Sequence, residues 1–326
     1  MNVLVVALLA AISFTALTAA ATALAYPHAR SWIGRLSGER RSAILLGVLA
    51  TPFVAGILLT ALALLPGLVG IAWPGLDHCT GHDDHHFHLC LVHTPGLAGL
   101  GSFTAFICAA FVPAGVRLGA TAVRVHRARR LVGILDTNAT LDAGGSHAVV
   151  ESELPFALTA GLLAPRVFVT SALLRDLDST SIAAMLAHEA AHVRRRDPLR
   201  KLLGDMLSAF HLPGARSTLL ADLSLACEES CDESAAAQIG DRADVAAALV
   251  ALGRLIERTP ERPALVGAAF GDSDIETRVR SLLSAPKIDP RIPSRGVWIA
   301  GATLVAALVV VPVHHITESL LGSVLG

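Results

Sequence analysis

Apolar residues in this chain are gathered into long, almost unbroken stretches near its two ends. Three plain stretches cover residues 3–25, 43–73 and 95–116, and a shorter fourth covers residues 297–313. About 20 helical residues cross a hydrocarbon core of about 30 Å, so the pattern predicts four transmembrane helices. The first stretch also fits the apolar part of a signal peptide. However, Met1-Asn2-Val3 supplies no basic segment before it, which favours an uncleaved span.

The segment between the third and fourth stretches has a different pattern. Residues 147–150 and 166–170 have the length and composition of short strands. Apolar residues then recur at helical spacing, and we expect a helix after the cap candidates Asp178, Ser179 and Thr180. Proline and glycine positions divide the rest into helices over 199–211, 217–238, 243–257 and 274–283.

These patterns predict a mainly α membrane protein with three parts. Residues 1–123 hold three spans and an external loop, residues 124–296 form an α+β domain with a small sheet and several helices, and residues 297–326 hold the fourth span. Hydrophobic residues make up 53% of the chain and charged ones 16%, which is too apolar for an ordinary soluble protein.

The distribution of basic residues predicts the orientation of the spans. Arginines follow the first and third spans, whereas the loop 74–94 contains no lysine or arginine. By the positive-inside rule, we expect the N-terminus and this loop outside the cell and residues 124–296 in the cytoplasm. The net charge of −1 gives no indication of direct nucleic-acid binding.

The segment His188-Glu189-Ala190-Ala191-His192 carries the most informative chemistry. Residues four apart share one face of a helix, so both imidazoles can bind one metal ion. Glu189 lies on the adjacent flank, where it can act as a base toward a water molecule. The alternative is an exposed helix with two surface histidines. An acidic motif downstream and the membrane context favour the metal site.

A catalytic zinc site needs a third protein ligand and one open position, and the segment 227–232 offers candidates. Glu228 and Asp232 share a helix face. This predicts Glu228 as the ligand and Asp232 as the acceptor of a hydrogen bond from the far nitrogen of a liganding histidine. Glu229 pairs by spacing with Glu233 on a rotated face and is the second choice. The cysteines at 227 and 231 are expected to be buried apolar residues rather than ligands.

Together these motifs resemble the BlaR/MecR family of membrane zinc metallopeptidases. Residues 188–199 are similar to that family's HExxH-x-R-R-x-D-P-L stretch, and residues 228–232 are similar to its E-x-x-C-D. Residues 162–171 resemble its strand before the active helix, and Phe210-His211-Leu212-Pro213 resembles its aromatic-polar-Pro turn. The resemblance covers most of residues 120–296, and the four-span topology agrees with it.

The resemblance implies a zinc endopeptidase of the minigluzincin type in a bacterial plasma membrane, with Glu228 as third ligand and Glu189 as base. It also implies a signal-transducing role, in which a transcriptional repressor or another cytoplasmic regulator is cut. Drug-sensing members carry a penicillin-binding domain after the last span, whereas this chain ends shortly after it. We therefore do not expect β-lactam sensing.

Several residues near the motif have weaker assignments. A substrate could bind by strand addition to the strand beside the helix if that strand is an edge, and its residues are Val167, Phe168 and Val169. His211 is a candidate oxyanion donor or, alternatively, a structural turn residue. We expect the arginines at 194–196 to form a solvated or headgroup-facing patch, and Asp197 to cap the following helix.

The loop between the second and third spans is rich in metal-binding side chains, namely His78, Cys79, His82, His85, His86, His88, Cys90 and His93. Three interpretations stay open. The loop could bind zinc or copper, its two cysteines could form a disulfide, or its histidines could be incidental in a polar loop. A metal bound outside could bias the packing of the spans that position the domain inside.

As a whole, the sequence predicts a zinc-dependent endopeptidase that hydrolyses peptide bonds of a cytoplasmic protein. Its expected cofactor is one catalytic Zn²⁺, with a second zinc or copper ion if the external loop binds metal. Its expected partners are a protein substrate and membrane lipid. The alternatives are a quality-control or CAAX-type membrane protease, which shares HExxH and E-x-x-x-D, and a non-catalytic metal receptor or scaffold. Oligomeric state and self-cleavage in the linker 284–295 stay open.

Overall fold

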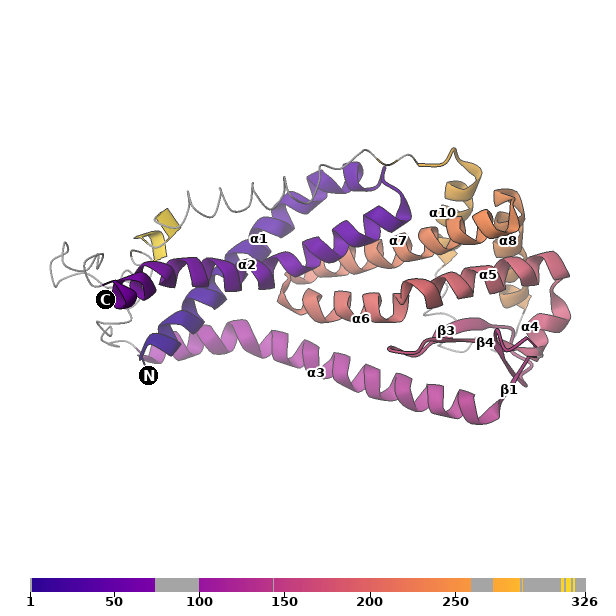
Figure 1. The fold of residues 1–326 in the computed structure, drawn as a ribbon, viewed down its shortest axis with the longest axis horizontal. Helices are drawn as coiled ribbons and strands as arrows, with labels where there is room; N and C mark the ends of the chain where they lie inside the picture. The colour runs from indigo at the N-terminus through magenta and orange to yellow at the C-terminus, as the bar shows by residue number, and fades with distance from the viewer. Residues whose placement is uncertain are drawn as a thin grey trace.

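Two long apolar helices at the start of the chain run side by side (Figure 1). The computed structural model describes residues 2–73, 100–142, 144–258 and 272–287, with residues 289, 312, 313, 315–317 and 319. Helix α1 covers Asn2–Ile33 and helix α2 covers Gly38–Ala72. Within the described residues, two helical stretches are long and apolar enough to cross a membrane, Ala7–Ile33 and Gly38–Gly70.

The other two predicted spans are not shown by the structure. Helix α3 covers Leu100–Asn138, so it includes most of the predicted span 95–116 and then continues well beyond it. The predicted span 297–313 lies outside the described residues apart from its last two positions. Two of the described helices are therefore candidate membrane spans by length and composition, and the four-span topology stays a prediction.

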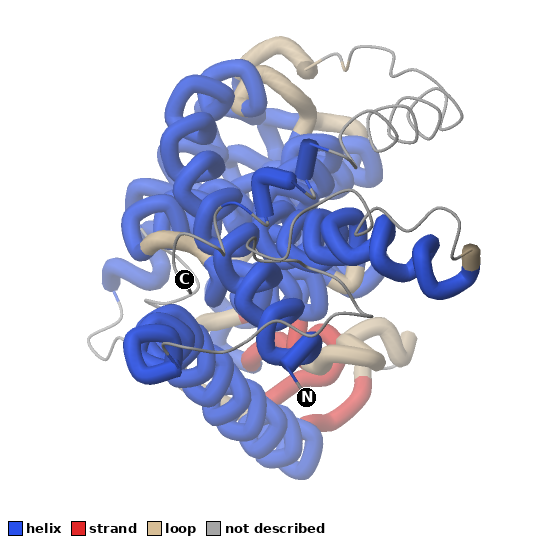
Figure 2. Tube along the Cα trace, turned by 90° about the vertical axis from the view of Figure 1, so that its left-hand side faces the viewer, coloured by secondary structure: helices blue, strands red, loops and turns tan. Residues whose placement is uncertain are grey.

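A small sheet of four short strands follows α3, and helices make up most of the other described residues (Figure 2). The strands are β1 (Ala139–Leu141), β2 (Ala148–Val150), β3 (Ala157–Ala160) and β4 (Arg166–Thr170). Their order in the sheet is β1-β2-β4-β3, with β2 and β4 parallel and the two outer pairs antiparallel. The sequence predicts β2 and β4 but misses β1 and β3.

The prediction of a substrate-binding edge at Val167, Phe168 and Val169 is wrong. These residues belong to β4, which pairs with a neighbour on both sides: Phe168 lies opposite Ala148 of β2 and opposite Leu158 of β3. Both rows of backbone groups are therefore already used. The edge strand on this side of the sheet is β3, whose sequence Ala-Leu-Thr-Ala carries little strand signal.

The helices between α4 and α10 build most of the segment that follows α3. They include every helix that the sequence predicts after residue 170. Asp178 caps α5, because its side chain accepts a hydrogen bond from the backbone N–H of Ser181 at 3.0 Å. The helices and the short 3₁₀ turn η3 are α4 (Ser171–Asp176), α5 (Ser179–Arg195), α6 (Asp197–Leu207), η3 (Ser208–Phe210), α7 (Pro213–Ile239), α8 (Arg242–Arg258) and α10 (Asp272–Leu283).

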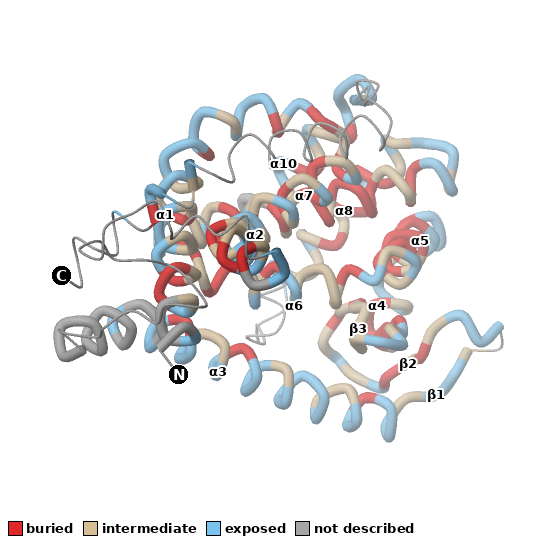
Figure 3. The backbone as a smooth tube through the Cα atoms, turned by 60° about the vertical axis from the view of Figure 1, so that its left-hand side comes forward, coloured by how far each residue is buried: buried red, intermediate tan, exposed pale blue. Residues whose placement is uncertain are grey.

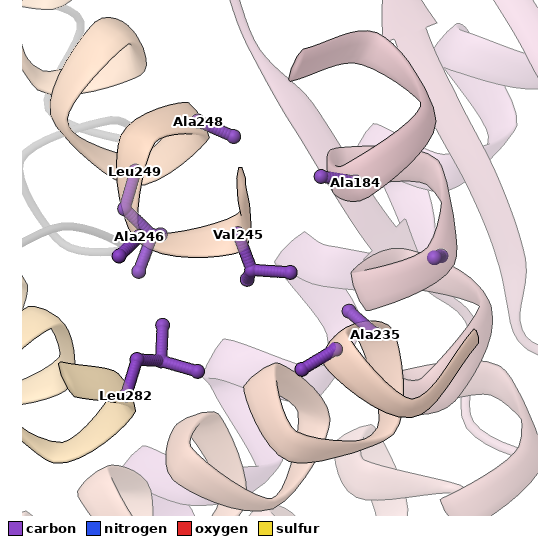
Figure 4. Close-up of a cluster of buried hydrophobic side chains, with 9 residues drawn as sticks. Ala184, Ala235, Val245, Ala246, Ala248, Leu249 and Leu282 are labelled. Atoms are coloured by element: carbon purple, nitrogen blue, oxygen red, sulfur yellow. The ribbon is translucent and has the colours of Figure 1, made fainter. Parts of the chain in front are cut away.

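Helices α5, α7, α8 and α10 pack together through small side chains. Figure 4 shows Ala184 of α5 and Ala235 of α7 facing Val245 and Leu249 of α8, with Leu282 of α10 beneath them. Buried positions gather on these helices, whereas α3 is exposed along most of its length (Figure 3). The small residues let α5 and α7 come close together, which brings their polar residues within reach of one another.

Helix α7 also packs against the two apolar helices. A buried cluster joins Tyr26 of α1 and Leu45 of α2 to Leu219 and Leu223 of α7. At its edge, Asp222 of α7 accepts hydrogen bonds from the Tyr26 hydroxyl at 2.6 Å and from two nitrogens of Arg30 at 2.7 and 2.8 Å. The loop that joins α1 to α2 therefore lies on the same side of the molecule as α7.

Close packing around Ala184 makes a stability prediction. Ala184→Leu places a large side chain where α5 meets α8, at a residue that is 1% exposed. Overpacking a filled core costs about 1–3 kcal/mol, so we expect a lower midpoint of thermal unfolding for the purified protein. Ala183→Leu, at an exposed neighbour on the same helix, is the control and should leave the midpoint unchanged. Equal midpoints for the two variants would contradict this packing.

Candidate metal centre

Helices α5 and α7 bring two histidines and one carboxylate to a common point. The Nε2 atoms of His188 and His192 lie 3.1 Å apart. The Glu228 carboxylate lies beside both, with Oε2 at 3.3 Å from His188 Nε2 and Oε1 at 3.6 Å from His192 Nε2. One ligand atom from each residue can thus face the same position.

The distances among these four atoms are close to those between the ligand atoms of a zinc ion. Zinc bonds of about 2.0–2.2 Å at tetrahedral angles place ligand atoms about 3.3–3.6 Å apart. The observed separations of 3.1, 3.3 and 3.6 Å differ from that range by 0.2 Å or less. Two imidazoles and one carboxylate are also a donor set that catalytic zinc sites use.

The outer nitrogen of His188 faces a buried carboxylate. Its Nδ1 lies 2.9 Å from Asp232 Oδ1, one helical turn beyond Glu228 on α7. Asp232 is itself held by Arg278 of α10, whose Nε and Nη2 donate to its two oxygens at 2.8 and 2.7 Å. Arg278 also lies 3.3 Å from Glu228 Oε2. No motif in the sequence points to Arg278, because only the packing of α10 on α7 brings it to the site.

Asp197 faces the outer nitrogen of His192. The two residues are joined by a hydrogen bond of 2.8 Å between His192 Nδ1 and Asp197 Oδ2. The backbone of Arg196, between α5 and α6, adopts the left-handed conformation, with φ of 54°. The chain therefore turns sharply, and Asp197 points back to the histidine. The prediction that Asp197 caps the next helix is wrong: α6 begins at Asp197, and its buried side chain fixes the ring of His192.

A second group of side chains could hold a metal, but its chemistry fits less well. Cys231 Sγ lies 3.2 Å from both His192 Nδ1 and Asp197 Oδ2. Burial raises the pKa of the Cys231 thiol to about 12, so the sulfur keeps its proton at neutral pH and is a poor ligand. Its S–H can instead donate to Asp197. Cys227 is buried in the cluster that joins α7 to α1 and α2.

The Glu228 carboxylate is charged in this setting. Burial alone would raise its pKa, but the charge of Lys201 and the contacts with the two histidines lower the pKa well below its usual range. Lys201 of α6 lies 2.9 Å from Glu228 Oε1. A charged carboxylate beside two imidazoles favours a cation at the point where they meet.

Glu189 borders a cleft beside the candidate metal position. The hydroxyl of Thr159 in β3 donates to Glu189 Oε2 at 2.7 Å. A cleft of about 320 Å³ runs along this contact and is lined by residues of β3, by both histidines, and by Lys201 and Glu228. An edge strand, a carboxylate and the candidate metal ligands therefore face one open space. Sequence reasoning missed Thr159, whose contact depends on β3 lying next to α5.

Other residues singled out in the sequence lie elsewhere. Glu229, the second choice for the ligand, faces away and lies 3.1 Å from Arg41 of α2. His211 contacts the carbonyl oxygen of Leu49 at 3.1 Å and does not line the cleft, which supports its alternative assignment as a structural turn residue. The arginine patch is only partly solvated, since the Arg195 side chain is 10% exposed. The histidine- and cysteine-rich loop lies outside the described residues.

Comparison with known proteins identifies one matching family. Residues 129–281 match the family model described as peptidase family M48, a segment that runs from the last turns of α3 into α10 and includes every residue of the centre. That family is zinc-dependent in general and typically membrane-bound. The match indicates a metallopeptidase, but it does not extend to the specificity of the BlaR/MecR family. No curated protein and no solved structure matches the chain.

The charges of the site predict how zinc affinity depends on pH. Burial lowers the pKa of His188 and His192, but the carboxylates around them outweigh it, so both pKa values are raised. Zinc binds neutral imidazole. Protons therefore still compete above pH 6.5, the ordinary histidine value. We expect zinc affinity, measured by chelator competition, to keep rising between pH 7 and 8. An affinity that is constant above pH 6.5 would contradict this.

Proposed function

We propose that this chain is an integral-membrane zinc-dependent endopeptidase that cuts a cytoplasmic protein. The observation that carries the proposal is that ligand atoms of His188, His192 and Glu228 converge on one point beside the carboxylate of Glu189. The family match supports the peptidase chemistry. The two apolar helices support the membrane location.

Each residue of the centre has a separate role in the proposed hydrolysis. Zinc held by the three ligands would polarise the scissile carbonyl and activate a water molecule. Glu189 accepts a proton from that water as its oxygen attacks the carbonyl carbon, and it passes the proton to the amine as the C–N bond breaks. Thr159 holds the Glu189 carboxylate at the cleft through its hydroxyl. Asp232 and Asp197 keep the two imidazoles in position.

Strand β3 offers backbone groups to an extended substrate. Thr170 N–H donates to Phe156 O at 3.1 Å. Because hydrogen-bonded pairs alternate along antiparallel strands, the backbone N–H and C=O of Ala157 and Thr159 point away from β4. These groups lie at the edge of the sheet and along the cleft. We propose that the substrate adds to this edge as an antiparallel strand.

The proposed substrate is a cytoplasmic regulator, and the role is signalling. Two observations support the cytoplasmic side. The end of α1, the start of α2 and the turn between them carry the arginines of the positive-inside pattern. Arg30 of α1 and Arg41 of α2 form ion pairs with α7. These contacts support a location of the domain on the side of the membrane that these arginines mark. The resemblance to the BlaR/MecR family supports a transcriptional repressor or similar regulator as substrate.

Replacement of Glu189 tests the catalytic assignment. Glu189→Gln removes the base and keeps the metal ligands, so we expect cleavage of an unfolded protein substrate to fall by about 10²- to 10⁴-fold. Zinc content, measured by mass spectrometry of the purified protein, should stay at one ion per domain. Retained cleavage would exclude Glu189 as the base. Lost zinc would show that Glu189 belongs to the ligand set.

The same variant tests the signalling role in cells. New N-termini of cytoplasmic proteins are compared between cells carrying the wild type and Glu189→Gln, with and without added zinc or copper. A single regulator cut only by the wild type supports signalling, and dependence on added metal would implicate the external loop. Many damaged membrane proteins cut regardless of metal would indicate quality control. No difference would favour a receptor or scaffold.

A proline in β3 tests the substrate edge. Thr159→Pro removes the outward N–H, so we expect a higher KM for peptide substrates while zinc affinity is unchanged. Thr159→Ala separates the loss of the hydroxyl from the loss of the N–H. Leu141→Pro places the same residue on β1, the opposite edge of the sheet, and should not alter KM. Equal KM values for Thr159→Pro and Thr159→Ala would show that the substrate does not pair with β3.

A further inference from the structure

The first turn of α2 is in close contact with the helix that carries Glu228. A Cβ atom added to Gly38 would lie 2.7 Å from the backbone nitrogen of Ser230 and 2.8 Å from the carbonyl oxygen of Ala226. Both neighbours are backbone atoms of α7, so they cannot move aside without moving the helix. Glycine at position 38 therefore sets how closely α2 approaches the segment 226–230, which contains Glu228.

Glu39, the next residue, contacts each of the three helices that build the metal centre. Its carboxylate pairs with Arg195 at the end of α5 and lies 3.4 Å from Arg200 of α6. It also accepts a hydrogen bond from the Ser230 hydroxyl of α7 at 3.3 Å. One carboxylate at the start of α2 thus contacts the helix that carries both histidines (α5), the helix that carries Asp197 (α6) and the helix that carries Glu228 (α7).

Arg195 continues the contact from Glu39 to a metal ligand. Its Nε donates to Asp197 Oδ2 at 3.2 Å, and the same oxygen bonds to His192 Nδ1 at 2.8 Å. Arg195 also contacts the Ser42 hydroxyl of α2 at 3.3 Å. Two residues of α2 therefore hold the arginine that orients Asp197, and Asp197 orients His192.

A buried ion pair anchors the same turn of α2. Arg41 is 7% exposed and lies 3.1 Å from the carboxylate of Glu229, the neighbour of Glu228. Separating a buried charge from its partner is strongly destabilising. A shift of α2 relative to α7 would have to break this pair together with the contacts of Glu39.

We propose that the first turn of α2, residues 38–42, is a positioning element of the metal centre. It sets the orientation of His192 through Arg195 and Asp197, and it sets the position of α7 through Gly38 and Arg41. This inference rests on the proposed zinc peptidase function. It makes zinc affinity and catalysis sensitive to the packing of the two membrane helices, because α2 carries both the apolar span and this turn.

Glycine replacements on α2 provide the main test, made on the full chain in detergent or nanodiscs. Gly38→Ala must push α2 from α7, so we expect zinc affinity to fall about 10-fold and the visible spectrum of the cobalt-substituted protein to change. Gly47→Ala is the matched control, because a Cβ there meets no atom within 4 Å. It should leave zinc affinity, the cobalt spectrum and cleavage unchanged.

Glu39→Gln tests the contact with Arg195 without adding volume. Glu39 is 58% exposed, and exposed ion pairs are individually weak, so we expect a smaller loss of about 3-fold in zinc affinity and kcat, with KM unchanged. Glu153→Gln, at another exposed carboxylate paired with an arginine, is the control. In a chain that already carries Arg195→Gln, Glu39→Gln should cause no further loss of zinc affinity or kcat. The contacts from Glu39 through Arg195 to Asp197 are already absent in that chain.

The outcomes separate this inference from the proposed function. A wild type that binds no zinc and cuts nothing would overturn the function itself. A wild type that binds zinc and cuts, with Gly38→Ala equal to Gly47→Ala and Glu39→Gln equal to Glu153→Gln, would overturn the inference alone. Additive losses in Glu39→Gln/Arg195→Gln would exclude the path through Arg195 and Asp197.

Discussion

Buried carboxylates need cations beside them, and this requirement links the parts of the structure to one another. Asp197, Glu229 and Asp232 are each 5% exposed or less. Removing such charges from water costs several kcal/mol unless they are paired. The partners are supplied by Arg195 at the end of α5, by Arg41 of α2 and by Arg278 of α10. Three separate segments are thereby fixed around α6 and α7.

The same pairing gives the proposed peptidase its site. Asp197 and Asp232, once neutralised by arginines, hold the outer nitrogens of His192 and His188, and the inner nitrogens then face Glu228. The two apolar helices take part directly, since the first turn of α2 supplies Glu39 and Arg41. Helix α7, which carries Glu228, is packed against the end of α1 and the start of α2.

Local patterns in the sequence are enough to place much of this arrangement. The helical period and the Asp178 cap predict α5, and the four-residue spacings place His188 beside His192 and Glu228 on one face with Asp232. Contacts between distant segments leave no such pattern. Arg278 and Thr159 reach the site only through tertiary packing, and the left-handed conformation of Arg196 turns Asp197 from a cap into a partner of His192. The edge position of β3 depends on the order of the strands, which a four-residue segment does not encode.

Zinc-edge X-ray absorption of the purified chain identifies the atoms that bind the metal and so tests the proposed ligand set of His188, His192 and Glu228. The protein should be loaded with one zinc per chain, with Cys79 and Cys90 replaced by serine so that the external loop supplies no thiolate. We expect only nitrogen and oxygen neighbours, at about 2.0–2.2 Å, from His188, His192 and Glu228. A sulfur neighbour at about 2.3 Å would contradict this ligand set and would indicate a thiolate ligand, for which Cys231 is the candidate beside His192 and Asp197.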